Sequence, residues 1–293
     1  MAWMQLKFST DQQHVDLISD WLTELGAVSM TYQDAHDDPI LEPLPGETPL
    51  WQDLIVSALF DAAINTGELM KVIAEGPFQS NIINPMFEQL EDKDWVRAWM
   101  DDFKPMQFGQ RLWIVPSWHA PPDPSAVNIL LDPGLAFGTG THPTTALCLE
   151  WLDQADVAGK EVLDFGCGSG ILAIAAAKLA AKSVVAVDID PQAIVATKDN
   201  MQRNGLADDA INSCLSSRYQ AGLYDLVLAN ILAGPLCQLA ETLASQVKQG
   251  GDIVLSGLLA EQAEEISNHY EKWFNMSRAV GKDDWVRLHG VKR

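Results

Sequence analysis

In the second half of the chain, short apolar segments alternate with segments of helical periodicity, and this alternation constrains the fold more than any other feature. The expected strands are 162–165, 184–188, 226–230 and 253–256, and the expected helices are 169–181, 191–204, 235–247 and 260–270. Such alternation is typical of a parallel sheet covered on both faces, an α/β doubly wound, Rossmann-like fold. Because such sheets bind ligands beyond the carboxyl ends of their strands, functional residues are expected there.

The first of these strands runs into a glycine-rich turn within the string VLDFGCGSGILAIAA. Gly166, Gly168 and Gly170 allow the backbone to adopt positive φ and to approach a ligand closely. The helix that follows presents unpaired N–H groups, which suit a carboxylate or a phosphate. The turn therefore predicts a cofactor site that includes Gly166 and Gly168.

Two classes of cofactor compete for this turn. Gly168, Gly170 and Ala173 satisfy the dinucleotide pattern GxGxxA, but in that pattern the first glycine directly follows the strand, where this chain has Gly166. Asp164, on the strand, is unfavourable beside a pyrophosphate and suits an ammonium group. We therefore expect a ligand with both a carboxylate and an amine, as in the methionine part of S-adenosylmethionine.

Two later strands end in polar residues. Asp188 lies 24 residues after Asp164, where an acidic side chain hydrogen-bonds the ribose hydroxyls of a nucleoside. Asp190 directly precedes Pro191 and fits the N-cap of the next helix. Asn230 ends the strand YDLVLAN, and its carbonyl oxygen can accept a hydrogen bond from an incoming amine.

The string LDPGLAFGTGTHPTT, residues 131–145, precedes the sheet. Pro143 suits the first turn of a helix, with Thr141 or His142 as its cap. The glycines allow the segment to close over a cofactor, with the hydroxyl of Thr144 or Thr145 facing the ligand.

The first ninety residues predict a ferredoxin-like βαββαβ order. The expected strands are near 4–8, 28–32, 54–60 and 82–90, and the expected helices are near 15–25 and 66–74. Thr10 and Gln13 fit a capping box for the first helix, and Gly26 fits its end. Residues 34–53 are rich in Asp, Glu and Pro and predict an exposed loop.

Three regions follow from these patterns: an acidic ferredoxin-like domain (1–90), a Trp-rich linker (91–126) and a cofactor-binding domain (127–293). The linker is expected to hold a short helix over 94–102 with two of its four tryptophans.

The chain is strongly acidic, with a net charge of −21. Residues 1–100 hold four basic and 17 acidic residues, a net of −13. This charge disfavours direct binding of nucleic acid and favours a cationic partner. The four cysteines form no CxxC pair, which argues against a disulfide framework and against a zinc site, and a reducing cytoplasm is expected. No apolar run approaches the roughly 20 residues needed to span a membrane, and we see no secretory signal.

The string DFGCGSG, followed by VDID and a polar residue after the fourth strand, resembles the class I S-adenosylmethionine-dependent methyltransferases. The strings LDPGLAFGTGTHPTT and ANILAGPL, behind EDKDWVRAWMDDFKPMQFGQRLWIVPSW, resemble the PrmA family over essentially the whole chain. That family methylates the eleventh protein of the large ribosomal subunit. The resemblance implies that Thr145, Gly166, Asp188 and Asn230 contact the cofactor. It also implies methylation of the N-terminal amine and lysine side chains of the substrate, held by the N-terminal domain.

We therefore expect a cytoplasmic, monomeric protein N-methyltransferase that acts on a basic ribosomal protein and has no nucleic-acid or membrane partner. Asn230 is the expected catalytic residue, which orients the amine while water takes its proton. The alternatives are a class I methyltransferase for another amine and a non-catalytic cofactor-binding protein of ribosome assembly. A nicotinamide dehydrogenase is disfavoured by the frame of the glycines.

Overall fold

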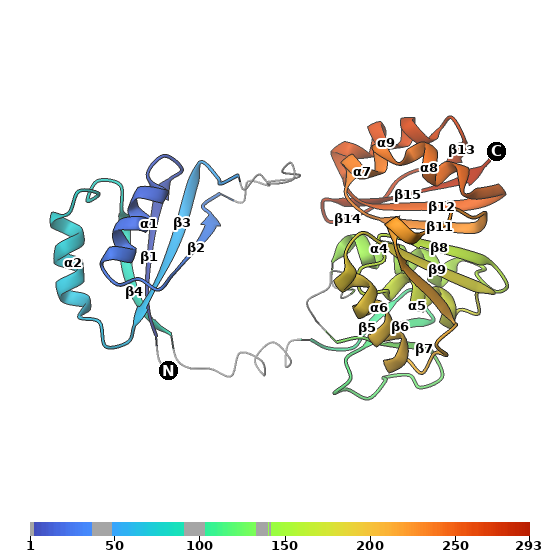
Figure 1. The fold of residues 1–293 in the computed structure, drawn as a ribbon, viewed down its shortest axis with the longest axis horizontal. Helices are drawn as coiled ribbons and strands as arrows, with labels where there is room; N and C mark the ends of the chain where they lie inside the picture. The colour runs from blue at the N-terminus through green and yellow to red at the C-terminus, as the bar shows by residue number, and fades with distance from the viewer. Residues whose placement is uncertain (1–2, 37–48, 91–102, 133–139, 141) are drawn as a thin grey trace. The chain divides into compact units, whose positions relative to one another are not determined.

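The computed structural model describes residues 3–36, 49–90, 103–132, 140 and 142–293, and it divides into two compact units, Met1–Trp99 and Met100–Arg293 (Figure 1). Most of the loop expected over 34–53, all of the helix expected over 94–102, and residues 133–139 and 141 of the glycine-containing string lie outside the described residues. Within the described part of the chain, no helix is both long and apolar enough to cross a membrane.

The first unit is a four-stranded antiparallel sheet with two helices, in the order β2-β3-β1-β4. This strand order confirms the ferredoxin-like prediction. Its elements are β1 (Trp3–Asp11), α1 (Val15–Glu24), β2 (Ser29–Asp34), β3 (Asp53–Asp61), α2 (Thr66–Glu75) and β4 (Ile83–Leu90).

Side chains of β1 alternate between a buried and a partly exposed face. Leu6 and Phe8 are buried, whereas Lys7 between them is partly exposed. The same core includes Ile18 from α1 and Ile73 from α2. Both helices therefore cover one face of the sheet, as the period of two along a strand requires.

Helix α1 begins at Val15, as expected, but its cap differs from the sequence prediction. Thr10 is buried within β1, where it pairs with Leu54 in β3, so the predicted capping box is wrong. The carboxylate of Asp11 instead accepts hydrogen bonds from the backbone N–H groups of Gln13 and His14, at 2.9 and 3.1 Å. Strand pairing continues through Thr10, the residue that the capping pattern requires. Thr10 therefore belongs to the sheet and does not cap the helix.

The second unit contains an eight-stranded sheet in the order β10-β9-β8-β11-β12-β15-β13, with β14 paired to β15. Strands β8 to β12 are parallel, and β15 is antiparallel to β12. The strand order reverses between β8 and β11, which is where such a sheet binds its ligand. The elements are α4 (Pro143–Gln154), β8 (Glu161–Phe165), α5 (Ile171–Lys178), β9 (Ser183–Asp188), α6 (Pro191–Arg203), β10 (Ile211–Leu215), η1 (Ser216–Arg218), β11 (Tyr224–Asn230), α7 (Ala233–Gln238), α8 (Ala240–Ser245), β12 (Val247–Leu259), η2 (Ala260–Gln262), α9 (Ala263–Tyr270), β13 (Phe274–Met276), β14 (Val280–Lys282) and β15 (Trp285–Lys292).

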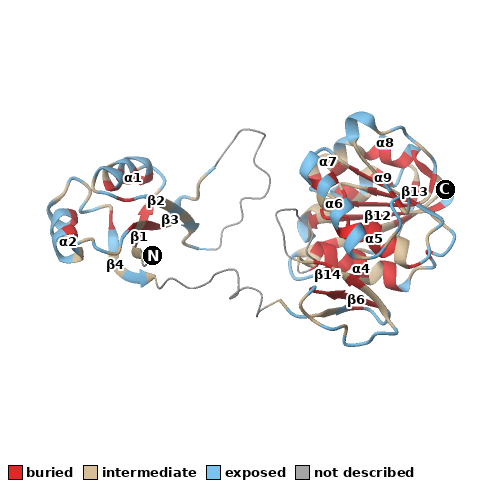
Figure 2. Ribbon diagram, turned by 60° about the horizontal axis from the view of Figure 1, so that its bottom comes forward, coloured by how far each residue is buried: buried red, intermediate tan, exposed pale blue. Residues whose placement is uncertain are grey.

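Helices cover both faces of this sheet, and buried residues fill the two layers between (Figure 2). Leu228 of β11 belongs to the core under α4, α5 and α6, whereas Val227 belongs to the core under α7, α8 and α9. The continuous apolar strands of the sequence follow from this two-sided burial.

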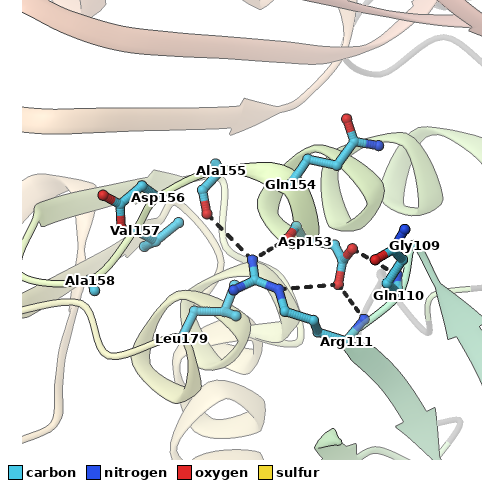
Figure 3. Close-up of a pocket in the computed structure, with 10 residues that line it drawn as sticks. All are labelled: Gly109, Gln110, Arg111, Asp153, Gln154, Ala155, Asp156, Val157, Ala158 and Leu179. Carbon is cyan, nitrogen blue, oxygen red and sulfur yellow. Dashed lines mark hydrogen bonds and ion pairs between the residues drawn. The ribbon is translucent and has the colours of Figure 1, made fainter.

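A small three-stranded sheet, β5-β6-β7, corrects the predicted linker. Strands β5 (Met106–Phe108) and β6 (Leu112–Val115) fall within the expected linker 91–126, yet β6 pairs with β7 (Val127–Leu130) in parallel. The turn between β5 and β6 is fixed by Asp153 at the end of α4 (Figure 3). Its buried carboxylate accepts hydrogen bonds from the backbone N–H groups of Gln110 and Arg111, both at 2.7 Å, and of Leu112 at 3.1 Å. Residues 103–126 therefore belong to the second unit.

Candidate active site

A cavity of about 530 Å³ lies at the carboxyl ends of β8, β9 and β11, at the reversal of strand order. Its volume is typical of a site for a small ligand. Gly166, Gly168, Asp188 and Asn230 all line it, so the structure brings together four of the five predicted site residues.

The glycine turn forms one wall of the cavity. Gly166 and Gly168 have φ of +81° and +52°, conformations that favour glycine. A Cβ atom on Gly166 would lie 2.2 Å from Cγ2 of Ile231, so a side chain there would displace the opposite wall. The backbone can therefore approach a ligand at this turn.

Asp188 joins the end of β9 to the glycine turn. Its Oδ2 accepts a hydrogen bond from the N–H of Gly168 at 2.9 Å, and its Oδ1 accepts one from the N–H of Asp190 at 3.0 Å. Each oxygen retains a lone pair for a ligand hydroxyl. Asp190 caps α6 by accepting the N–H of Gln192 at 2.8 Å, which confirms the sequence prediction.

Asn230 supplies an acceptor atom that has no partner among the described residues. Its Nδ2 donates to Oγ1 of Thr145 at 3.2 Å. Its Oδ1 is buried and makes no hydrogen bond to the described residues. An unpaired buried acceptor costs about 1–3 kcal/mol. Because Asn230 also lines the cavity, a donor on a bound molecule would remove this cost.

The last residues of the string LDPGLAFGTGTHPTT, from His142 to Thr145, lie at the start of helix α4. The structure assigns the cap to His142, whose ring Nδ1 accepts a hydrogen bond from the N–H of Thr144 at 3.4 Å. Burial lowers the pKa of His142, which favours the neutral ring. Thr144 lines the cavity, whereas Thr145 is fully buried behind Asn230.

Asp164 does not line the cavity. Its Oδ2 accepts a hydrogen bond from the N–H of Ala173 in α5 at 3.0 Å, and its Oδ1 is buried without a partner among the described residues. Burial raises the pKa of Asp164 to about 7. In this structure the carboxylate thus contacts the first turn of α5, where the sequence led us to expect an ammonium group.

The sequence did not identify two residues of the cavity wall, Trp285 and Ser216. Trp285 comes from β15, and Ser216 follows β10, and neither strand was predicted. Trp285 contacts the ring of His142 edge-on, with centroids 4.8 Å apart. The alternation of WVRLHGVK, which has a partly exposed residue between buried ones, was the available signal for β15.

The cavity offers a glycine turn, an acidic side chain beside it and an amide oxygen that no described residue pairs with. The rest of its wall is largely apolar. These features fit S-adenosylmethionine, whose methionine end suits the turn and whose ribose suits Asp188. A parallel-rich sheet with this site at its reversal defines a class I methyltransferase.

Comparisons with known proteins agree with this class. The family model described as ribosomal protein L11 methyltransferase (PrmA) matches residues 2–293. Proteins named ribosomal protein L11 methyltransferase from Shewanella denitrificans and Shewanella sp. strain ANA-3 are each 55% identical over the full length of both chains. A crystal structure titled ribosomal protein L11 methylase, from Lactobacillus delbrueckii subsp. bulgaricus, is 35% identical with a TM-score of 0.59, and covers 65% of this chain and 100% of its own.

The chain belongs to the ribosomal protein L11 methyltransferase (PrmA) family. It is therefore an S-adenosylmethionine-dependent methyltransferase, and S-adenosylmethionine is its methyl donor.

Proposed function

We propose that this chain transfers methyl groups to the N-terminal amine and lysine side chains of ribosomal protein L11. The names of its relatives support that substrate. The observation that carries the choice of an amine is the buried Oδ1 of Asn230, an acceptor without a partner among the described residues on the cavity wall. An amine donates a hydrogen bond to such an oxygen and keeps its lone pair for attack.

We assign Gly166 and Gly168 to the methionine end of the cofactor and Asp188 to its ribose. Asn230 contacts both the cofactor and the amine, and is the catalytic residue. Thr145 holds the amide of Asn230 through the 3.2 Å hydrogen bond, so its hydroxyl fixes which end of the amide faces the cavity.

The cofactor supplies a methyl group on a sulfonium, and the chain's own residues supply position. Holding the amine in line with that methyl group accounts for most of the catalysis. A lysine, with an ordinary pKa of about 10.4, must lose a proton before it attacks. The apolar wall assists because burial disfavours the charged amine. We assign Asp188 to the ribose, and Nδ1 of His142 is already bonded to Thr144, so we assign the proton to water.

The first unit recruits the substrate through charge. Its acidic surface attracts a basic protein over several ångströms and repels free RNA. Because the proposed substrate is a ribosomal protein, we place the reaction in the cytoplasm. We also propose that the enzyme acts as a monomer.

The test is incubation of the chain with isotope-labelled S-adenosylmethionine and purified L11, followed by mass mapping of the peptides. Label on the N-terminal amine and on lysines is expected. Ribosomal RNA and a second basic ribosomal protein serve as controls. Label in the RNA or only in the second protein, or none in L11, would reject the proposal.

A further inference from the structure

A thiol, a carboxylate and an imidazole converge between α7 and α9, outside the cavity. Cys237 lies near the end of α7, and Glu265 and His269 lie four residues apart on α9. Residues four apart in a helix share one face. One ligand atom from each of the three side chains lies within 4.8 Å of the other two. In the part of the chain that the structure describes, this is the one group of its kind.

The separations suit a single metal ion. Sγ of Cys237 and Nδ1 of His269 are 3.9 Å apart. Two ligands on one tetrahedral Zn²⁺ lie about 3.5 Å apart, given Zn–S and Zn–N bonds of about 2.3 and 2.0 Å. A change of a few tenths of an ångström therefore brings both atoms to bonding distance. Glu265 is exposed, so its carboxylate can turn toward the ion without disturbing the core.

The chemistry of the three groups selects the metal. Calcium and magnesium prefer ligand sets made of oxygen atoms. Thiolate and imidazole ligands favour Zn²⁺, as does a tetrahedral arrangement. We propose that Cys237, Glu265 and His269 bind one Zn²⁺, with water as the fourth ligand. This inference is independent of the proposed substrate.

Binding changes the protonation of two ligands. The thiol of Cys237 releases its proton to solvent, because the thiolate is the ligand. In the structure, Nδ1 of His269 is 2.9 Å from the carbonyl oxygen of Glu265, to which it can donate a hydrogen bond. Coordination through Nδ1 requires the ring proton on Nε2. Metal binding displaces protons, so zinc affinity should fall as pH drops.

The site lies on the far side of one cavity wall. Pro235 and Leu239, which flank Cys237 along the chain, both line the cavity. A metal ion that joins α7 to α9 would hold this wall in place, because it binds the folded arrangement alone. Zinc should therefore raise the melting temperature of the full chain, and the Cys237→Ser variant should lose that rise.

Co²⁺ provides the direct test, because it binds at zinc sites and, unlike Zn²⁺, absorbs visible light. We expect the full, untagged and reduced chain to bind one Co²⁺, with a thiolate-to-cobalt charge-transfer band and visible bands of tetrahedral intensity. Zn²⁺ should abolish both. Cys237→Ser should remove the charge-transfer band, whereas Cys214→Ser, which changes the other partly exposed cysteine, should keep it.

Competition with a chromophoric chelator then tests the other two ligands. His269→Ala and Glu265→Gln should each weaken zinc binding about tenfold or more, within the range that loss of a metal-site contact produces. Glu264→Gln is the matched control, since Glu264 is the exposed neighbour on the same helix turn. Circular dichroism checks that each variant is folded. A missing charge-transfer band, a band that survives Cys237→Ser, or equal effects at Glu264 and Glu265 would overturn the proposal.

Discussion

The sheet of the first unit carries helices on one face only, whereas the main sheet of the second unit carries them on both. In the second unit, two-sided burial fixes where each strand ends, and polar side chains at those ends converge on one cavity. In the first unit the acidic side chains are dispersed over an exposed surface. The exposed ones include Asp16, Asp20, Glu24, Asp61, Glu68, Glu75 and Glu88.

This difference implies two kinds of sensitivity to mutation. Function in the second unit should depend on single residues held at fixed positions. Function in the first unit should depend on total charge, so that no one residue matters much. The following experiments test this contrast.

The largest effect should come from removing the first unit. A polypeptide of residues 103–293, which keeps β5 and β6, should bind S-adenosylmethionine normally but lose about 10³-fold in kcat/KM for L11, the upper range for electrostatic steering. Added salt should slow the full chain, since exposed charges are screened beyond about 8 Å at physiological ionic strength. The single variant Glu68→Gln should change little. Full activity of the shortened chain would remove the recruitment role.

Asp164 tests what burial does to a carboxylate in the second unit. Its folded pKa of about 7 exceeds the usual 3.8, so the folded state holds a proton that the unfolded state releases between these values. Stability should therefore fall as pH rises from about 4 to about 7, by at most about 4 kcal/mol. Asp164→Asn should lack this fall. Urea unfolding of both proteins at several pH values measures it, and parallel curves would contradict it.

Gly168→Val should weaken cofactor binding by roughly 10²-fold, or about 2.7 kcal/mol, because the side chain would enter the cavity. Gly205→Val is the matched control. Gly205 also has positive φ, +66°, but a Cβ there would meet no atom within 4 Å. Calorimetry with S-adenosylmethionine measures both. Equal affinities would mean that Gly168 is only a turn residue.

Asn230→Ala should lower kcat by roughly 10²-fold, about 2.7 kcal/mol, and weaken cofactor binding less, as expected for one well-placed polar contact. Asn230→Asp should keep cofactor affinity but hold the amine protonated, so its kcat should recover as pH rises. Steady-state kinetics at two pH values distinguishes the two variants. If Asn230→Ala changed only the KM for the cofactor, the orienting role would belong to another group.

Asp188→Ala should weaken S-adenosylmethionine binding by about 1.5–3 kcal/mol, the value of a hydrogen bond to a charged group. Asp190→Ala, two residues away, should leave that affinity unchanged and cost about 1 kcal/mol of stability through the lost helix cap. Calorimetry and urea unfolding separate the effects. Tight binding of NADH, or equal affinity losses in both variants, would contradict the assignment of Asp188.

The sequence predicted most accurately where local pattern and burial agree. Strands β9 and β11 contain continuous apolar runs, so both their positions and their polar ends at Asp188 and Asn230 were predictable. The ferredoxin-like order was predictable in part for a similar reason, since β1 and β2 alternate in period two.

The sequence failed where tertiary contacts decide the structure. Strand β10, INSCL, has few strong strand formers and exists because it pairs with β9. The turn before β6 is fixed by Asp153, more than forty residues later, so a local pattern suggests a linker. The expected helix 235–247 is divided into α7 and α8 at Leu239, which packs toward the cavity. A local sequence pattern contains no information about these distant contacts.

Strand β15 also has a consequence for synthesis of the protein on the ribosome. It inserts between β12 and β13, so β12 keeps an open, apolar edge until residue 292 has emerged. Since chains fold from the N-terminal end as they are made, the nascent second unit presents an edge at which another strand can add. The same strand delivers Trp285 to the cavity wall, so the nascent enzyme acquires its complete cavity only when this sheet edge closes.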